Sequence, residues 1–280
     1  MLDSKTTKKI NDFVYAKPRT IQEVAFLLQK NWRTANSYVE KIEKETGSIS
    51  TRTFRKGTRG ALKIVFWNNI ERIHSSEFQE KMLRKIEEGK KKDDFSAFDI
   101  YQYVDEKKRS ASLEIVSDEE KTNIQDFANA LKSAQSQVLF FSGNASFTNL
   151  PYGNKRIIGL IEELARNKIS IKILARVELP GIKNIKELNA INERIGKEAI
   201  EIRHCEQPLR ATIVDSKVAR LKEIKLPGEY RKGELGKKTF IFYEIYDQEW
   251  IEWLQKVFWG MFRTAIPAGR RIADLESINK

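Results

Sequence analysis

The chain has 280 residues, of which 40% are hydrophobic and 32% are charged. This length and composition are typical of a soluble globular protein with room for two domains. No apolar run approaches the roughly 20 residues that a membrane span requires, and the N-terminus lacks the apolar core of a signal peptide, so we expect a cytoplasmic protein. The formal net charge of +12 at pH 7 favours an acidic partner.

Metal and redox chemistry have few candidate residues in this sequence. The single cysteine, Cys205, excludes an intramolecular disulfide, and with two histidines, His74 and His204, a zinc site made of Cys and His would be hard to assemble. We therefore expect no metal and no cofactor. The many Lys, Glu, Arg and Ile residues are typical of thermophilic or archaeal proteins.

The first 47 residues carry signals for three helices. Residues 3–16 have apolar residues at helical spacing and predict the first helix. Thr20, with Glu23 three residues later, forms a capping box for a second helix, and Asn31 can cap a third helix that ends at Gly47. In the third helix the residues at helical spacing, which we expect to face inward, are Trp32, Ala35, Val39 and Ile42.

A two-stranded ribbon is expected next, closing an N-terminal domain at residues 1–67. Residues 49–54 and 61–66 are rich in β-branched and aromatic residues and roughly alternate in polarity. The tip between them contains two glycines, which permit a tight reversal, and three cations. Two short helices followed by such a ribbon are the order of a winged helix-turn-helix, which places one helix in the DNA major groove. Residues 1–67 hold 14 Lys or Arg and 6 Asp or Glu, so a net +8 of the chain's +12 lies here.

Double-stranded DNA is therefore the expected partner of this domain. The outer face of the third helix is short, polar and basic, as contacts to base edges and phosphates require. Tyr38 borders the inward face and can pack there instead. The expected major-groove contacts are Arg33, Thr34, Ser37, Tyr38 and Lys41, and the expected ribbon contacts to phosphates or the minor groove are Arg55, Lys56 and Arg59. A solvated helix face with a solubilising hairpin is the alternative.

Residues 68–110 are interpreted as a helical connector. Apolar residues at near-helical spacing predict a helix from about Ser75 to Lys90. No second helix nearby in sequence covers its apolar face, so it serves either as the dimerisation helix of a homodimer or as a helix packed on its own C-terminal domain. Residues 105–110 are predicted to form a surface turn or linker.

Residues 111–280 alternate between helical and strand patterns, which indicates an α/β domain around a mixed sheet. A capping box at Ser117 predicts a helix to about Ser133. Further helices are expected at 156–167 and 185–196, and strands at 138–141, 169–174, 199–203, 209–214, 217–222 and 239–243. The last helix, rich in Trp and Phe from Trp250 to Phe262, is expected to lie buried against the sheet, with a tail after it.

The order of elements in 117–266, with a strand ending in Val-Asp-Ser and a final helix rich in Trp and Phe, resembles a phospholipase D-like domain. Enzymes of that superfamily carry His-x-Lys-x4-Asp, in which the histidine is the nucleophile in phosphoryl transfer. In the matching stretch Asp215 is present, Arg210 stands in place of the lysine and Pro208 in place of the histidine. Proline cannot attack phosphorus, and His204 lies four residues too early, so we expect no catalysis.

A winged helix joined through a helical connector to a non-catalytic phospholipase D-like domain resembles the archaeal TrmB family of transcriptional regulators. The resemblance implies a DNA-binding repressor or activator, usually dimeric, whose C-terminal domain can sense a small molecule. Sugars are typical effectors of that family, but no residue here specifies a sugar. The alternatives are a phospholipase D-like nuclease or phosphotransferase guided by the winged helix, and a module whose winged helix binds protein.

A ligand pocket in the C-terminal domain is expected at the ends of the strands. Arginine is a bidentate binder of phosphate and carboxylate groups, so an anionic ligand is favoured. The candidate ligand-binding residues near strand ends are Ser142, Asn144, Arg176 and Arg210. The alternatives are a structural ion pair between Arg210 and Asp215 and an ordinary surface charge at Arg176.

Overall fold

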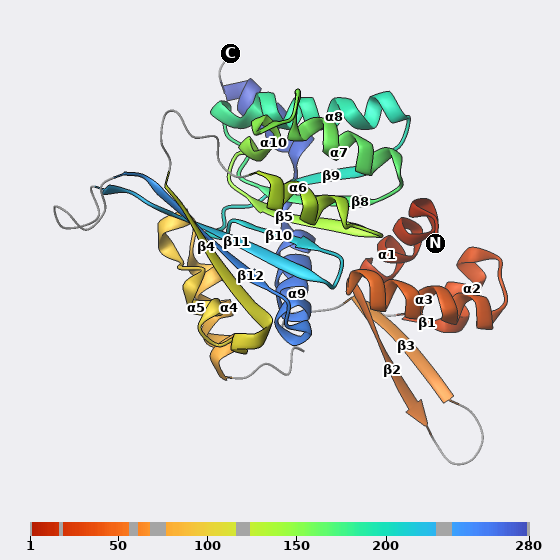
Figure 1. Cartoon of the computed structure of the whole chain (residues 1–280). Coiled ribbons are helices and arrows are strands. Elements are labelled where there is room, and N and C mark those ends of the chain that lie inside the picture. The colour runs from red at the N-terminus through yellow and green to blue at the C-terminus, as the bar shows by residue number, and fades with distance from the viewer. Residues whose placement is uncertain are drawn as a thin grey trace.

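The computed structural model of the chain describes residues 2–16, 19–55, 61–67, 77–115, 124–227 and 237–278. An N-terminal unit of helices with a small antiparallel sheet is followed by a larger unit around an eight-stranded mixed sheet (Figure 1). The two-part α/β fold class expected from the sequence is therefore confirmed.

Three helices form the N-terminal unit: α1 (Ser4–Ala16), α2 (Ile21–Leu28) and α3 (Trp32–Thr46). The Thr20 hydroxyl accepts from the Glu23 amide while the Glu23 carboxylate accepts from the Thr20 amide, which confirms the capping box. Asn31 Oδ1 accepts from the Thr34 amide over 2.9 Å, and Gly47 ends α3 in the left-handed region at φ +62°. Because each cap joins residues close in sequence, the sequence alone predicts where α2 and α3 begin and where α3 ends.

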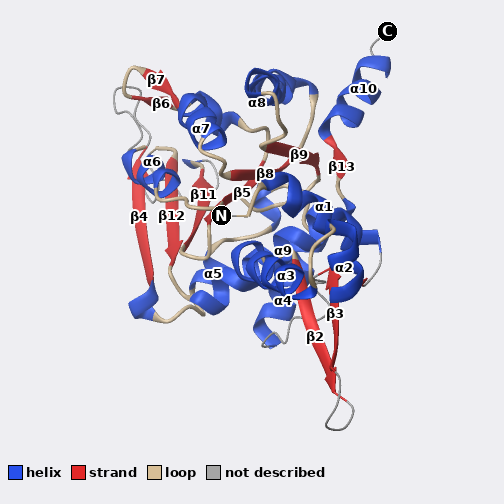
Figure 2. Cartoon of the chain, turned by 90° about the vertical axis from the view of Figure 1, so that its right-hand side faces the viewer, coloured by secondary structure: helices blue, strands red, loops and turns tan. Residues whose placement is uncertain are grey.

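A three-stranded sheet completes this unit. β2 (Ile49–Arg55) and β3 (Ala61–Trp67) pair antiparallel, and the short β1 (Arg19–Thr20) pairs with β3. The β2–β3 ribbon projects away from the rest of the molecule in both views (Figures 1 and 2). Helices and ribbon share one core, whose fully buried members include Ile10, Val24, Val39, Ile49 and Val65. This arrangement is that of a winged helix, with α2 and α3 as the helix-turn-helix.

The eight-stranded sheet has the order β13-β9-β8-β5-β10-β11-β12-β4. Along the chain its strands are β4 (Arg109–Ile115), β5 (Gln137–Ser142), β8 (Ser170–Ala175), β9 (Ile200–His204), β10 (Ala211–Val214), β11 (Val218–Lys225), β12 (Thr239–Ile245) and β13 (Ile266–Pro267). β5, β8 and β9 are parallel, and the other neighbours are antiparallel. A separate small hairpin pairs β6 (Pro151–Tyr152) with β7 (Lys155–Arg156).

Helices cover both faces of this sheet (Figure 1). One face carries α6 (Gln125–Lys132), α7 (Ile157–Arg166), α8 (Ile182–Ile195) and α10 (Ala268–Ile278); the other carries α4 (Glu77–Glu88), α5 (Phe98–Tyr101) and α9 (Gln248–Thr264). Successive strand residues point to opposite faces, so Phe140 joins the core beneath α6 and α7 while Phe141 joins the core of α9.

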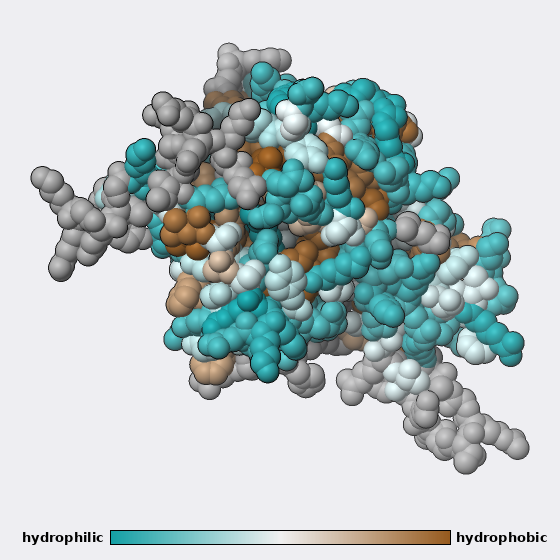
Figure 3. Space-filling model, viewed as in Figure 1, coloured by the Kyte–Doolittle hydropathy of each residue, from teal (hydrophilic) through white to brown (hydrophobic). Residues whose placement is uncertain are grey.

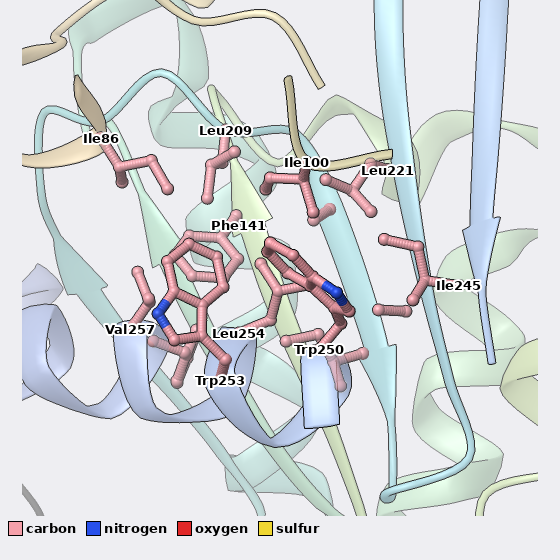
Figure 4. Close-up of a cluster of buried hydrophobic side chains, with 14 of the residues drawn as sticks. Ile86, Ile100, Phe141, Leu209, Leu221, Ile245, Trp250, Trp253, Leu254 and Val257 are labelled. Carbon is pink, nitrogen blue, oxygen red and sulfur yellow. The ribbon is translucent and has the colours of Figure 1, made fainter. Parts of the chain in front are cut away.

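The α9 helix lies at the centre of the second core (Figure 4). Trp250, Trp253, Leu254 and Val257 point from it toward the sheet and toward Ile86 of α4. None of these four α9 residues is more than 8% exposed. The expectation of a helix buried against the sheet is confirmed.

The connector helix α4 packs into that same core. Met82 and Ile86 are 2% and 0% exposed and belong to the cluster that contains the α9 side chains. Phe78, near the start of α4, stacks on Tyr103 with ring centroids 4.3 Å apart. The apolar face of α4 is therefore covered by its own chain, which is the second of the two roles considered for it. Residues 68–76, including the expected helix start, lie outside the described residues.

Three segments differ from the sequence-based expectation. Trp32 was expected to face inward but is 57% exposed, because it is the first residue of α3 and lies at the end of the buried stripe. A turn or linker was expected over residues 105–110, but the edge strand β4 begins at Arg109 and pairs with β12. An additional helix, α10, replaces the expected tail and buries Ile272. The first part of the helix expected at 117–133 lies outside the described residues.

The described ranges contain neither a candidate membrane span nor a candidate metal cluster. No helix there is long and apolar enough to cross a membrane, and no three His, Cys, Asp or Glu side chains are grouped to hold a metal ion. Burial raises the pKa of the Cys205 thiol to about 11. His204 Nδ1 accepts a hydrogen bond from the Val177 amide over 3.0 Å.

Candidate nucleic-acid interface and a cationic cavity

The outer face of α3 presents most of the side chains expected to meet DNA bases. Arg33 and Ser37 are exposed, and Thr34 and Lys41 are half-buried. The Arg33 guanidinium lies 5.8 Å from the centroid of the Trp32 ring. Figure 3 shows the face of the N-terminal unit that is turned to the viewer as largely hydrophilic. Short polar and basic side chains on an exposed helix face can reach base edges and phosphates.

The remaining expected contacts have different surroundings. Tyr38 is half-buried and packs against the N-terminal core, which is the alternative that its position at the edge of the apolar stripe left open. Arg55 is the last residue of β2. Lys56 and Arg59 lie outside the described residues.

Two glutamates of α3 are bound by the ribbon. Glu40 accepts from Lys63 Nζ over 2.7 Å and from Asn36 Nδ2 over 2.9 Å, and the hydrogen bond from Lys63 lowers the pKa of the Glu40 carboxyl. Glu43 accepts from the amide and hydroxyl of Thr51 over 2.8 and 3.0 Å. The bonds from Lys63 and Thr51 join α3 to the ribbon, and the Lys63 ammonium offsets the charge of Glu40, which would otherwise repel a phosphate backbone.

The C-terminal end of α3 is anchored to the α/β unit. Gln137 Nε2 donates to the Glu45 carbonyl oxygen over 2.7 Å, and Trp259 Nε1 donates to the Thr46 carbonyl oxygen over 2.6 Å. The last carbonyl groups of a helix have no partner within it, so these two donors satisfy acceptors that need one. The helix is held at the end away from Arg33, and the side chains near its start remain accessible.

A cavity of about 400 Å³ lies where the central strands of the eight-stranded sheet end. Ser142 ends β5, Arg176 follows β8 and Arg210 precedes β10, so three strands bring their ends to one place. All four residues considered for ligand binding line this cavity: Ser142, Asn144, Arg176 and Arg210. A Cβ at the neighbouring Gly143 would lie 2.8 Å from Arg210 Nη2. The absence of a side chain at Gly143 therefore allows the Arg210 guanidinium to occupy this position.

Two further cations of the cavity, Arg220 and Lys222, were missed in the sequence. Both belong to β11 and alternate with Ala219 and Leu221, which are buried in the α9 core. Period-two alternation therefore turns the two cations toward the opposite face of the sheet, where the cavity lies. The sequence shows this alternation of cations and apolar residues, but it does not show that a cavity lies beside the cations.

These cations are poorly hydrated and only partly paired. Burial lowers the pKa of Arg210 to about 10 and that of Lys222 to about 8. Arg220 is 5% exposed, and within the described part of the chain its Nε and Nη1 have no hydrogen-bond partner. Glu244 Oε1 lies 3.5 Å from Arg220 Nη1 and compensates part of its charge. A buried cation is costly unless an acceptor compensates its charge.

Asp215 lies at the opposite end of β10 and holds the start of β5. Its carboxylate accepts hydrogen bonds from the three amides of residues 135–137, over 2.8 to 2.9 Å, and from the Ser136 hydroxyl over 2.8 Å. The alternative of an ion pair between Arg210 and Asp215 was therefore wrong. The two residues lie at opposite ends of β10. A carboxylate that accepts so many backbone bonds has a structural role.

Pro208 and His204 are the two residues that were compared with the catalytic histidine of the phospholipase D-like motif. Neither places an imidazole in the cavity. Pro208 packs against Gly89, where an added Cβ would lie 2.8 Å from the proline Cγ. His204, bonded to the Val177 amide, is not among the residues that line the cavity.

Comparison with known proteins gives no matching family model and no matching curated protein. Among solved structures, the chain is similar to TrmBL2, an archaeal chromatin protein whose structure is described as showing a novel mode of DNA binding. That similarity covers 94% of this chain and 93% of TrmBL2, with a TM-score of 0.40 and 14% identity.

Two further solved structures resemble a little more than half of this chain. NucT from Helicobacter pylori matches 57% of this chain and 99% of its own, with a TM-score of 0.41 and 15% identity. Nuc, a phospholipase D family member from Salmonella typhimurium, matches 56% of this chain and 98% of its own, with a TM-score of 0.40 and 13% identity. Scores and identities this low do not assign a family, so any functional conclusion must rest on the residues of this chain.

Proposed function

We propose that this protein is a sequence-specific, DNA-binding transcriptional regulator of the TrmB type. The observation that supports the proposal is the disposition of α3. Its C-terminal end is anchored by Gln137 and Trp259, two of its glutamates accept hydrogen bonds from the ribbon, and Arg33 and Ser37 stay exposed. A firmly held helix with short polar and basic side chains suits the major groove of double-stranded DNA.

In this proposal the α/β unit is a non-catalytic domain that binds a small anionic effector. Pro208 stands at the position of the nucleophilic histidine, and the Asp215 carboxylate accepts hydrogen bonds from backbone amides. The motif therefore offers no nucleophile for phosphoryl transfer. The cavity beside Ser142, Arg176 and Arg210 offers the effector site. We propose a homodimer in the cytoplasm, because two copies of α3 can read two half-sites one DNA turn apart.

Fluorescence anisotropy of labelled duplex DNA with the full chain tests DNA binding directly. The titration is run across a salt series and repeated with competing random DNA. We expect the logarithm of the affinity to fall steeply with the logarithm of the salt concentration, and some duplexes to resist competition. Absence of binding at low salt would overturn the proposal and favour a protein-binding winged helix.

The enzymatic alternative is tested separately. The full chain is incubated with duplex DNA, single-stranded DNA and a chromogenic phosphodiester, with and without a chelator. We expect no turnover. Cleavage that persisted in a double variant lacking His74 and His204 would favour a nuclease or phosphotransferase with a different nucleophile.

A further inference from the structure

We propose that the cavity between β5, β10 and β11 binds a small aromatic phosphate monoester, the chemistry found in a nucleoside monophosphate. The inference rests on the proposed effector role of this cavity and adds the class of ligand. Three observations carry it: a buried arginine with two unsatisfied donors, a cluster of cations with one carboxylate among the lining residues, and an aromatic wall in the same cavity.

Arg220 is a buried cation of the cavity wall whose hydrogen-bonding capacity is not fully used. It is 5% exposed, and its Nε and Nη1 donate to no acceptor in the described part of the chain. The nearest carboxylate oxygen, Glu244 Oε1, lies 3.5 Å from Nη1, which is a charge contact longer than an ordinary charge-assisted hydrogen bond. A buried guanidinium with unsatisfied donors is costly, and ligand oxygens that reach it would reduce that cost. A phosphate offers several oxygens at once in a geometry that suits the guanidinium fork.

Charge in the cavity wall favours a multiply charged anion. Arg176, Arg210, Arg220 and Lys222 line it, while Glu178 is the carboxylate among the lining residues. Glu178 Oε2 lies 3.5 Å from Arg176 Nε and so offsets that arginine first. Arg210, Arg220 and Lys222 remain, and Glu244 offsets part of the charge of Arg220. A phosphate monoester carries nearly two negative charges at neutral pH, which suits them better than a single carboxylate.

An aromatic wall adjoins the cations. Phe127 of α6 and Phe147, in the 3-10 turn Ser146–Asn149, line the cavity and are half-buried. Phe147 is held by stacking on Phe140, with ring centroids 4.5 Å apart and an interplanar angle of 8°. Fixed rings that retain some exposure favour a flat apolar group in the ligand. The cavity volume of about 400 Å³ lies within the usual range for small-molecule sites.

Isothermal titration calorimetry with the full chain, in the absence of DNA, tests the inference. The probes are phenyl phosphate, adenosine 5′-monophosphate, adenosine and inorganic phosphate. We expect at least one ring-bearing phosphate to bind about tenfold more tightly than either adenosine or inorganic phosphate. Binding of phenyl phosphate as well as the nucleotide indicates recognition of the shared class, whereas binding of the nucleotide alone indicates that the base is recognised too.

Variants locate the site. Arg220→Gln and Lys222→Gln should each weaken the ring-bearing phosphate about tenfold or more, because each removes a charge-assisted contact. Arg270→Gln, at an exposed arginine of α10, is the matched control and should leave affinity unchanged. Circular dichroism and thermal melting confirm that each variant is folded before titration.

Specific results overturn the inference. The inference is rejected if neither phenyl phosphate nor adenosine 5′-monophosphate binds with a Kd below about 1 mM. It is also rejected if inorganic phosphate binds as tightly as both of these ring-bearing phosphates. Binding that Arg220→Gln and Lys222→Gln leave unchanged would place the ligand elsewhere. Because DNA is absent from these titrations, such failures leave DNA binding intact, and a loss of DNA binding in the anisotropy assay leaves this ligand test unaffected.

Discussion

The indole Nε1 of Trp259 donates a hydrogen bond to the carbonyl oxygen of Thr46 over 2.6 Å and so ties α9 to the last residue of α3. Gln137 adds a second tie, to the adjacent Glu45 carbonyl, from the first residue of β5. The last residue of that strand, Ser142, lines the cationic cavity. One short strand therefore contacts both the proposed recognition helix and the proposed ligand site.

The Trp259 bond is expected to contribute measurably to stability. Trp259→Phe leaves the Thr46 carbonyl without this donor, and we expect the free energy of unfolding to fall by about 1–3 kcal/mol beyond the loss of ring size. Trp253→Phe is the control, because Trp253 is as deeply buried but its Nε1 has no partner within the described residues. Urea unfolding of both variants measures the difference, and equal losses would show that the bond contributes nothing.

Asp215 is expected to act as a structural carboxylate. Asp215→Ala removes the acceptor of three backbone amides, and we expect it to lower the free energy of unfolding by about 2–4 kcal/mol. Asp215→Asn should cost less, since Asn keeps one acceptor oxygen and tolerates the left-handed backbone at φ +48°. Chemical denaturation measures both, with the exposed Asp126→Ala expected to stay within about 0.5 kcal/mol of wild type. Similar costs for Asn and Ala would contradict this role.

Arg33 and Lys56 are expected to contribute to DNA binding in different ways. Arg33→Ala should weaken binding by about 1–3 kcal/mol and relax sequence preference if Arg33 reads a base. Lys56→Ala, at a ribbon-tip position outside the described residues, should weaken all sequences alike and reduce the salt slope by about one. Anisotropy with matched and random duplexes measures both, with Arg270→Ala as control. Equal losses on every duplex from both variants would reject this division.

The lowered pKa of Lys222 predicts a pH dependence of stability. Burial lowers it to about 8, Lys238 and Arg220 act in the same direction, and Glu114 opposes them. The unfolded chain keeps a value near 10.5, so between these pH values it binds more protons than the folded chain. The free energy of unfolding should therefore rise with pH across that window, relative to Lys222→Met. Urea unfolding at about pH 7.5 and pH 9.5 tests the sign, and parallel changes in both proteins would contradict it.

Gly143 is expected to preserve the position of Arg210. A Cβ in Gly143→Ala would lie 2.8 Å from Arg210 Nη2 and 3.1 Å from its Cζ, so the flexible side chain must move. We expect affinity for phenyl phosphate to fall about threefold to tenfold with little change in melting temperature. Gly159→Ala is the control, because its Cβ would make only ordinary contacts, the nearest 3.7 Å from Lys155 Cδ. Unchanged calorimetric affinity in Gly143→Ala would remove Arg210 from the ligand site.

Much of the fold could be predicted because its signals are local. Thr20 with Glu23, and Asn31 with Gly47, mark the helix ends through bonds between residues close in sequence. The apolar spacing of α9 likewise predicts a buried helix, because a continuous stripe of large side chains must leave water. Strand ends also indicated where Arg176 and Arg210 would gather.

Relationships between distant segments required the tertiary structure. The sequence by itself determined the winged-helix order, the helix caps, the alternating α/β pattern and the absence of a histidine at Pro208. Only the tertiary structure decided that β4 is an edge strand, that Asp215 binds the amides before β5, and that Arg220 shares a cavity with Arg176. Local hydrogen bonds and apolar periodicity depend on neighbours along the chain, whereas pairing, burial and pocket formation depend on residues that only folding brings together.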